Sequence, residues 1–273
     1  MYLLSNFILL FILVSKLSAA LYTTDSFEAF FEITENFTEK SLVILDVDRV
    51  IIEPKDAIMR YPNQRLLWEL RFQHGSHLTH EQMEDLTSRV TLSECTGLLD
   101  PLSVDFINKM KEKNIPIIAL TATSVEGYGQ IPSIPDWRIG DLARFGIKFD
   151  GCFTEHPFIE LAELYGRGSA PIFKSGILFS GGYPKGEVLE AFLDHVGFVP
   201  DKVLFVDDLL HNLVSVHTAA SELGVEEVFA FQYTRSDSLT NTIDPQLAAF
   251  QLKTLFQEGI WLSDEEALAK SSS

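Results

Sequence analysis

The chain has 273 residues, a length that suits one α/β domain with an insertion better than two independent cores. Its 39 acidic and 21 basic residues give a formal net charge of −18, and the acid is spread along the chain. Nucleic acids and anionic membrane surfaces bind proteins through concentrated cations, so this charge balance argues against either as a partner.

Residues 1–20 have the pattern of a secretory signal peptide. Phe7 to Val14 is an unbroken apolar octet, and Ser18-Ala19-Ala20 supplies small residues for cleavage. The octet is shorter than the ~20 apolar residues that a helix needs to cross a bilayer. Because no Lys or Arg precedes it, retention as an uncleaved membrane anchor stays an alternative. We expect a mature domain of residues 21–273, periplasmic or secreted, whose net charge of −19 reflects the loss of one Lys.

The segment between the apolar runs Leu42–Leu45 and Ile115–Leu120 is too long for a simple crossover helix. It holds two helical patterns, Ala57 to Phe72 and Thr79 to about Val90. Thr79, with Gln82 three residues later, forms the sequence signature of a capping box. We therefore expect a small helical insertion at about residues 53–100.

Outside this insertion, the sequence predicts three further helices and one hairpin. Residues 25–38 have the apolar spacing of an amphipathic helix, and Asp136 to Phe145 is a second helical pattern. A short hairpin is plausible within Cys152 to Gly182. The glycine-rich stretch Gly182 to Gly186 then opens a further helix, Glu187 to His195.

Three apolar runs end in polar side chains. The runs are Leu42–Leu45, Ile115–Leu120 and Val203–Val206, and they are typical of buried strands in a parallel sheet. The carboxyl ends of such strands form the edge at which open α/β sheets bind ligands. The sequence thus predicts an α/β fold with a parallel sheet. The polar residues expected at its ligand edge are Asp46 and Asp48, then Thr121, and finally Asp207 and Asp208.

In sequence and order these features resemble the four motifs of the haloacid dehalogenase-like (HAD) superfamily. Motif one, DxDx(T/V), matches Asp46 to Val50; motif two matches Thr121, motif three Lys185, and motif four Asp207-Asp208. The resemblance covers roughly residues 40–235, and it implies a Rossmann-like, doubly wound parallel sheet in which the helical insertion at about residues 53–100 is a cap over the site. The chain is also similar to an uncharacterised group of exported HAD-like proteins from intracellular bacteria.

The resemblance implies a phosphatase with an aspartate nucleophile. Asp46 would attack the phosphoryl group and form an aspartyl-phosphate that water hydrolyses. Asp48 would protonate the leaving oxygen and later deprotonate the water. The Thr121 hydroxyl and nearby backbone N–H groups, at Ala122, would hold a phosphoryl oxygen. Lys185 would offset the negative charge around Asp46.

The resemblance also implies a Mg²⁺ cofactor, because this hard cation prefers oxygen ligands. Its ligands would be the carboxylates of Asp46 and Asp207 and the backbone carbonyl of Asp48, with Asp208 as a further ligand or as a group that orients the ligands. An acid at position 48 points within the superfamily to transfer of phosphate to water, although sugar-phosphate mutases keep it too.

Several alternatives stay open. Lys174 competes with Lys185 for motif three, although the glycines and the helix around Lys185 favour the latter. A HAD-like fold that serves as a non-catalytic binding or host-interaction protein is the alternative to a phosphatase. The substrate is expected to be a small phosphorylated molecule, but no residue selects one.

Four further side chains and one cysteine pair invite weaker hypotheses. Cys95 and Cys152 are the only cysteines, and sequence cannot decide whether they form a disulfide. The run His74, His77 and His80 has no matching Cys or carboxylate at ligand spacing, so contact with substrate from the cap is preferred over metal binding. Arg60 is a candidate for reaching substrate phosphate from the cap.

Overall fold

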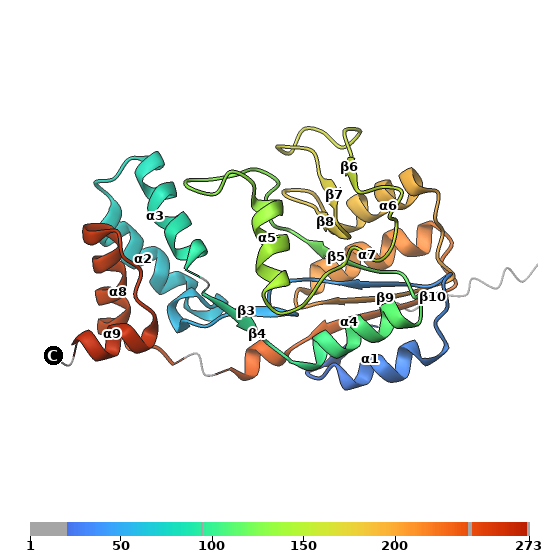
Figure 1. Cartoon of the computed structure of the whole chain (residues 1–273), viewed down its shortest axis with the longest axis horizontal. Helices are drawn as coiled ribbons and strands as arrows, with labels where there is room; N and C mark the ends of the chain where they lie inside the picture. The colour runs from blue at the N-terminus through green and yellow to red at the C-terminus, as the bar shows by residue number, and fades with distance from the viewer. Residues whose placement is uncertain (1–20, 94, 240–241, 272–273) are drawn as a thin grey trace, which may run out of the picture.

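The computed structural model describes residues 21–93, 95–239 and 242–271, and the predicted signal peptide lies outside them. A central, mostly parallel sheet with helices on both faces makes the chain an α/β protein, with a separate group of helices at one end (Figure 1). Within the described residues, no helix is both long and apolar enough to span a bilayer.

The sheet has eight strands in the order β1-β10-β9-β2-β5-β8-β7-β6. From β1 to β8 all neighbours in this order pair in parallel, whereas β7 and β6 are added antiparallel. The strands are β1 (Leu21–Thr24), β2 (Leu42–Leu45), β5 (Ile117–Thr121), β6 (Phe158–Glu160), β7 (Ile172–Lys174), β8 (Ile177–Phe179), β9 (Lys202–Asp207) and β10 (Glu227–Tyr233).

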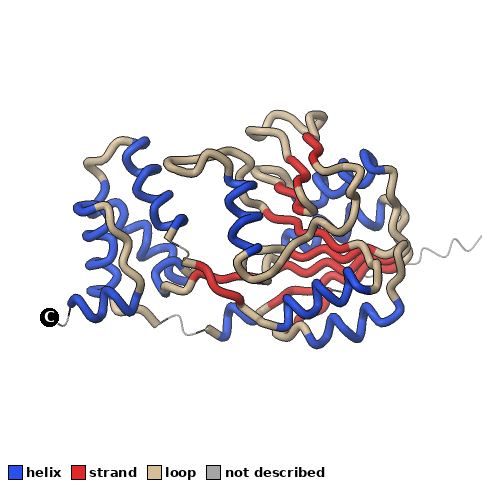
Figure 2. Tube along the Cα trace, in the orientation of Figure 1, coloured by secondary structure: helices blue, strands red, loops and turns tan. Residues whose placement is uncertain are grey.

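The three apolar runs of the sequence are confirmed as the central strands β2, β5 and β9. Alternate residues of each strand face opposite sides, so Val43 and Leu45 join one apolar cluster while Leu42 and Ile44 join the other. Helices α1 (Glu28–Ile33) and α4 (Leu102–Glu112) cover the first side, and α6 (Lys185–Val196) and α7 (Leu210–Glu222) cover the second (Figure 2). Burial on both faces explains why these strands are continuously apolar.

Two predicted helices differ in extent from the structure. The helix expected over 25–38 is helical only in α1, and a 3₁₀ turn at Thr34–Asn36 closes it. The pattern from Ala57 to Phe72 begins instead with two 3₁₀ turns, and α2 (Gln64–Gly75) starts after them. Pro62 explains this, because proline lacks the N–H that a continuous helix from Ala57 would need at this position.

Other predictions are confirmed. Helix α3 (His80–Leu92) opens with the expected capping box, in which the Thr79 hydroxyl accepts from the Gln82 N–H at 3.2 Å and Gln82 Oε1 accepts from the Thr79 N–H at 2.9 Å. Helix α5 (Ile134–Ala143) matches the pattern from Asp136. Strands β7 and β8 form the hairpin expected before Gly182.

The group of helices at one end, which we call the helical body, combines two distant parts of the chain. Helices α2 and α3 pack with α8 (Pro245–Glu258) around an apolar cluster of their own, and α9 (Asp264–Ser271) packs against α8 (Figure 1). An antiparallel ribbon of β3 (Ile52–Pro54) and β4 (Thr96–Leu98) connects α2 and α3 to the sheet. The sequence predicted α2 and α3 as an insertion but not the contribution of α8 and α9.

A hydrogen-bonded clasp fixes the C-terminal segment to the start of the insertion. The Ala57 N–H donates to Asp264 Oδ2 at 2.9 Å, and the Asp264 N–H donates to Asp56 Oδ1 at 2.9 Å. Asp56 Oδ2 accepts from Trp261 Nε1 at 2.8 Å, and Asp264 Oδ1 accepts from Gln251 Nε2 at 2.9 Å. The clasp therefore joins the two parts of the helical body through backbone and side-chain groups alike.

Candidate functional site

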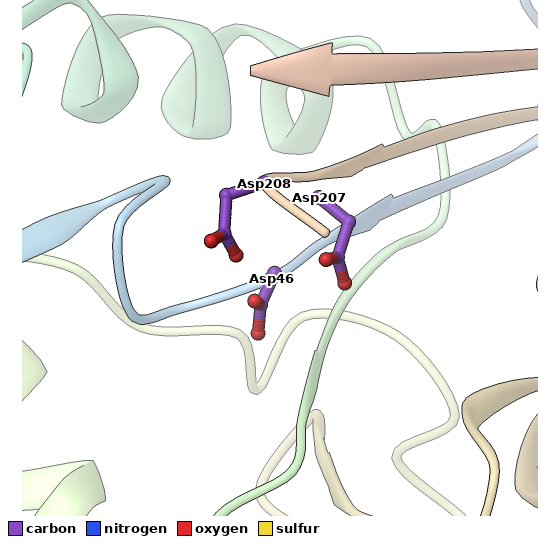
Figure 3. A group of neighbouring side chains, drawn as sticks. All are labelled: Asp46, Asp207 and Asp208. Atoms are coloured by element: carbon purple, nitrogen blue, oxygen red, sulfur yellow. The ribbon is translucent and has the colours of Figure 1, made fainter. Parts of the chain in front are cut away.

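The carboxylates at the carboxyl ends of β2 and β9 lie together at the edge of the sheet (Figure 3). These strands are neighbours, and the Asp46 N–H continues their ladder by donating to the Val206 carbonyl at 2.9 Å. One oxygen each of Asp46, Asp207 and Asp208 lies within 4.8 Å of the others. All three residues are buried, with Asp46 6% exposed. The sequence had predicted that these residues meet, and the structure brings them together.

Lys185 lies between two of these carboxylates. Its Nζ is 2.8 Å from Asp46 Oδ1 and 2.7 Å from Asp207 Oδ2, and the side chain is only 1% exposed. The competing Lys174 is partly exposed and pairs with Asp136 on α5. Lys185 is therefore the lysine that the fold places in the site.

Lys185 is the first residue of α6, and close packing of α6 against α7 fixes its position beside the carboxylates. A Cβ on Gly186 would lie 2.2 Å from the Ser215 carbonyl oxygen, so no larger residue fits without displacing backbone. The Gly186 N–H also donates to Ser215 Oγ at 3.0 Å. The glycine next to Lys185 thus sets the position of the first turn of α6.

Asp207 is held by more than the lysine. Its Oδ1 accepts from the Leu209 N–H at 2.8 Å, and Asn212 Nδ2 lies 3.0 and 3.1 Å from its two oxygens. Sequence analysis missed Asn212. The signal was present, because an Asn one turn into the helix that follows the paired aspartates is well placed to reach back to the first of them.

Arg49 is the cation that pairs with Asp208. Its φ of 64° lies in the left-handed region, so the backbone turns sharply after β2. Arg49 Nη1 donates to Asp208 Oδ2, Nε donates to Ser236 Oγ at 3.1 Å, and Nη2 donates to Asp237 Oδ1 at 3.0 Å. This arginine links the loop after β2 to the segment after β10.

Asp48 points to a different partner from the other carboxylates. Its side chain is 49% exposed, and Arg138 Nη2 donates to both of its oxygens, at 2.9 and 3.1 Å. Arg138 lies 90 residues further along the chain, on α5. Nothing in the local sequence pattern marks it, since the contact depends on how α5 packs against the loop after β2.

Thr121 ends β5, and its buried hydroxyl lies 2.7 Å from the Thr123 hydroxyl. Next to it, Ala122 lines a cavity of about 250 Å³ together with Arg167 and the turn at Gly181-Gly182. The lining residues follow β5 and β8, which are neighbours in the sheet, so the cavity lies at the carboxyl ends of these two strands.

Burial and charge shift the pKa values of the site. Burial raises the pKa of Asp46 well above its ordinary range; Lys185 opposes this, while Asp207 and Asp48 add to it. Burial raises the pKa of Asp208 to about 6, with Arg49 opposing the shift. Burial alone would lower the pKa of Lys185, but Asp46 and Asp207 raise it above its ordinary value. When all three carboxyl groups are ionised they outnumber Lys185 and Arg49 by one, so a bound cation would favour their ionised forms.

The donors fit a hard divalent cation, because carboxylate oxygens converge from three residues on two adjacent strands. No other group of three or more His, Cys, Asp or Glu side chains with this spacing occurs in the described part of the chain. The run of His74, His77 and His80 forms no such group, and His80 Nε2 instead lies 3.2 Å from Glu84.

Glu53 on β3 is a buried carboxyl near the site that sequence analysis missed. It is 6% exposed, and its Oε2 has no hydrogen-bond partner among the described residues. Burial raises its pKa to about 7, opposed by Arg49 and then Arg60, while Asp48 adds to the shift. An acid inside the apolar stretch Val50 to Pro54 was the signal that could have identified it.

Two weaker hypotheses are not supported by the structure. The Arg60 guanidinium donates to the carbonyls of Pro54 and Lys55, at 3.0 and 2.8 Å, which directs it to the backbone. Cys95 and Cys152 are free thiols. Cys95 packs in the helical body and Cys152 against the sheet, so the fold separates them, and burial raises the pKa of each to about 11.

Comparison with known proteins places the chain in a family. The model of the family described as "Protein of unknown function (DUF2608)" matches residues 23–268. The chain belongs to this DUF2608 family. An uncharacterized protein of Rickettsia prowazekii is 23% identical over 232 residues, covering 85% of this chain and 83% of its own length. An uncharacterized protein of Rickettsia bellii is 24% identical over 209 residues, covering 73% and 70%. No solved structure matches the DUF2608 chain.

Proposed function

We propose that this DUF2608 protein is a Mg²⁺-dependent phosphatase that hydrolyses phosphate monoesters through an aspartyl-phosphate on Asp46. The observation that carries the proposal is the buried Lys185 ammonium, which touches Asp46 and Asp207 where the carboxylates converge at the edge of the sheet. The order of the four motifs supports membership of the HAD superfamily with a Rossmann-like core. We also propose export, on the basis of residues 1–20.

The contacts of Asp46 suit a nucleophile. The Val47 N–H and Lys185 Nζ both lie 2.8 Å from its Oδ1, so this oxygen is fixed and the carboxylate plane is oriented. We assign the attack on phosphorus to the other oxygen, Oδ2. The Lys185 ammonium favours the anionic form of Asp46 and so opposes the effect of burial on its pKa, and it would balance charge that develops on the phosphoryl oxygens.

The residues that would hold Mg²⁺ are Asp46, Asp207 and Asp208, with the backbone carbonyl of Asp48 as a further ligand. When bound, the cation would neutralise the phosphoryl oxygens and the excess carboxylate charge. Asn212 and the Leu209 N–H orient Asp207, and Arg49 orients Asp208, so the ligands are already positioned by their neighbours.

The cavity beside Ala122 supports a place for the substrate. It lies next to the end of β5, and Arg167 is the cation among its lining residues. Thr121 and the backbone of Ala122 are the groups that we assign to the phosphoryl oxygens. The rest of a small phosphorylated substrate would occupy the cavity.

The test is hydrolysis of an aryl phosphate by residues 21–273, with Mg²⁺ and with a chelator, beside Asp46→Asn. We expect turnover that requires Mg²⁺ and that falls by at least about 10³-fold in Asp46→Asn, because the nucleophile is lost. The exposed Glu112→Gln is the matched control and should keep full activity. Absence of turnover from folded protein, with generic and metabolite phosphates alike, would instead favour the non-catalytic binding protein.

A further inference from the structure

Arg138 is a buried cation that the proposed chemistry leaves without a role. Its side chain is 7% exposed, although it lies on α5 next to a half-exposed carboxylate. Nη2 donates to Asp48 Oδ1 at 2.9 Å and to Oδ2 at 3.1 Å, so one nitrogen is shared by both oxygens of Asp48. A hydrogen bond between two charged groups is stronger than a neutral one, and this pair fixes the carboxylate from one side.

A second carboxylate, that of Asp141, holds the Arg138 guanidinium on the side away from Asp48. Its Nη1 lies 3.4 Å from Asp141 Oδ2, and the Asp141 carboxylate is buried. Asp141 also accepts from Arg144 and from the Thr96 hydroxyl at 3.1 Å. Thr96 belongs to β4, so the network spans α5 and the ribbon that leads to the helical body.

The Nε donor of Arg138 shows that the guanidinium is not placed to satisfy all of its own hydrogen-bond donors. Its Nε is buried and has no hydrogen-bond partner among the described residues. A buried donor without a partner carries a desolvation cost, so the guanidinium is not placed for the best satisfaction of its own donors. It is placed so that its Nη atoms reach Asp141 on one side and Asp48 on the other.

We propose that Arg138 is a positioning residue that fixes the Asp48 carboxylate in the orientation required for its proton transfers. Without the guanidinium, a half-exposed aspartate would rotate among its side-chain rotamers. With it, one acceptor position on each Asp48 oxygen is occupied by the same Arg138 nitrogen, which restricts rotation of the carboxylate. The inference rests on the proposed function, in which Asp48 is the general acid and base.

A double-mutant cycle tests whether Arg138 acts through Asp48. We expect Arg138→Gln to lower kcat for an aryl phosphate by about 10- to 100-fold, within the range of a general acid-base contribution, with KM changed less than about threefold. In the Asp48→Asn background the same change should lower kcat by less than about twofold, because the group that it positions is gone. Arg138→Lys should restore part of the loss. Equal losses in both backgrounds would overturn the inference, since a purely structural role acts on both.

A crystal structure of Arg138→Gln provides a readout independent of turnover. We expect the Asp48 side chain to leave its present rotamer while Asp46, Lys185 and Asp207 keep their contacts. An Asp48 carboxylate that stays in place would overturn the inference. Asp136→Asn is the matched control, because it breaks an exposed ion pair on the same helix and should change neither kcat nor Asp48.

The wild-type protein separates this inference from the proposed function. If the wild type hydrolyses the aryl phosphate and Asp46→Asn does not, the phosphatase proposal holds and the cycle decides the role of Arg138 alone. If the folded wild type does not turn over at all, the phosphatase proposal fails and the role given to Arg138 falls with it.

Discussion

The edge of the sheet and the helical body are stabilised in opposite ways. At the sheet edge, buried charges are held by direct partners: Lys185 contacts Asp46 and Asp207, and Arg49 contacts Asp208. In the helical body, α2, α3 and α8 pack around an apolar cluster, and the clasp between Asp56 and Asp264 joins its two parts through hydrogen bonds. Removing one charged partner at the sheet edge should therefore strongly lower the free energy of unfolding. Removing an apolar side chain from the helical body should mainly destabilise that body.

The largest expected effect is that of Lys185→Met, which keeps an unbranched chain but removes the charge. Asp46 and Asp207 would be left buried without their cation, and breaking such a pair costs about 3–5 kcal/mol. Urea unfolding in the presence of a chelator measures this loss. Lys174→Met removes an exposed ion pair and should cost less than about 1 kcal/mol. Equal effects of the two variants would contradict the view that the sheet edge depends on buried charge.

The second prediction concerns the helical body. Leu252→Ala removes a buried side chain of α8 from the apolar cluster, and we expect a loss of about 3 kcal/mol. Hydrogen exchange should show faster opening of α2, α3 and α8, while β2 and β9 keep their protection. Uniform acceleration over the sheet and the helical body would show that the two regions unfold as one unit.

The sheet edge and the helical body also differ in how well the sequence predicts them. The strands β2, β5 and β9 are short apolar runs, and the residues after them meet because parallel strands end at one edge. Those signals are local, so Asp46, Thr121 and Asp207 could be placed without a structure, whereas Lys185 was predicted from its resemblance to motif three. The helical body is not local, because α8 and α9 join α2 and α3 from the other end of the chain.

The missed site residues have the same physical explanation. Arg138 reaches Asp48 only because α5 packs beside the loop after β2, and no spacing along the chain encodes that contact. Asn212 and Glu53 carried weak local signals, as a polar residue one turn into a helix and as an acid in an apolar stretch. Pro62 marked the shortened start of α2, a boundary signal that apolar spacing alone does not reveal.

The smallest expected effect is a dependence on pH at the junction between the two regions. Burial raises the pKa of Glu53 from 4.5 to about 7, so the folded protein favours the protonated form. The stability that this contributes is fully present below pH 4.5 and is lost as pH rises through about 7. Relative to the wild type, Glu53→Gln should therefore gain about 2 kcal/mol in unfolding free energy between pH 5 and pH 8.

Urea unfolding of both proteins across this pH range measures the difference. The exposed Glu265→Gln is the control and should show no relative change with pH. A wild type and a Glu53→Gln variant that follow parallel stability curves would show that Glu53 is solvated or paired in solution.

The central claim is that Asp46 is a nucleophile in a phosphoryl-transfer site, and the most direct measurement is rapid quenching of the protein with an aryl phosphate and Mg²⁺, followed by intact-mass analysis and peptide mapping. We predict a transient gain of one phosphoryl group located on Asp46, which is absent from Asp46→Asn. Turnover without a phosphorylated protein, or a phosphoryl group located on another residue, would contradict the account.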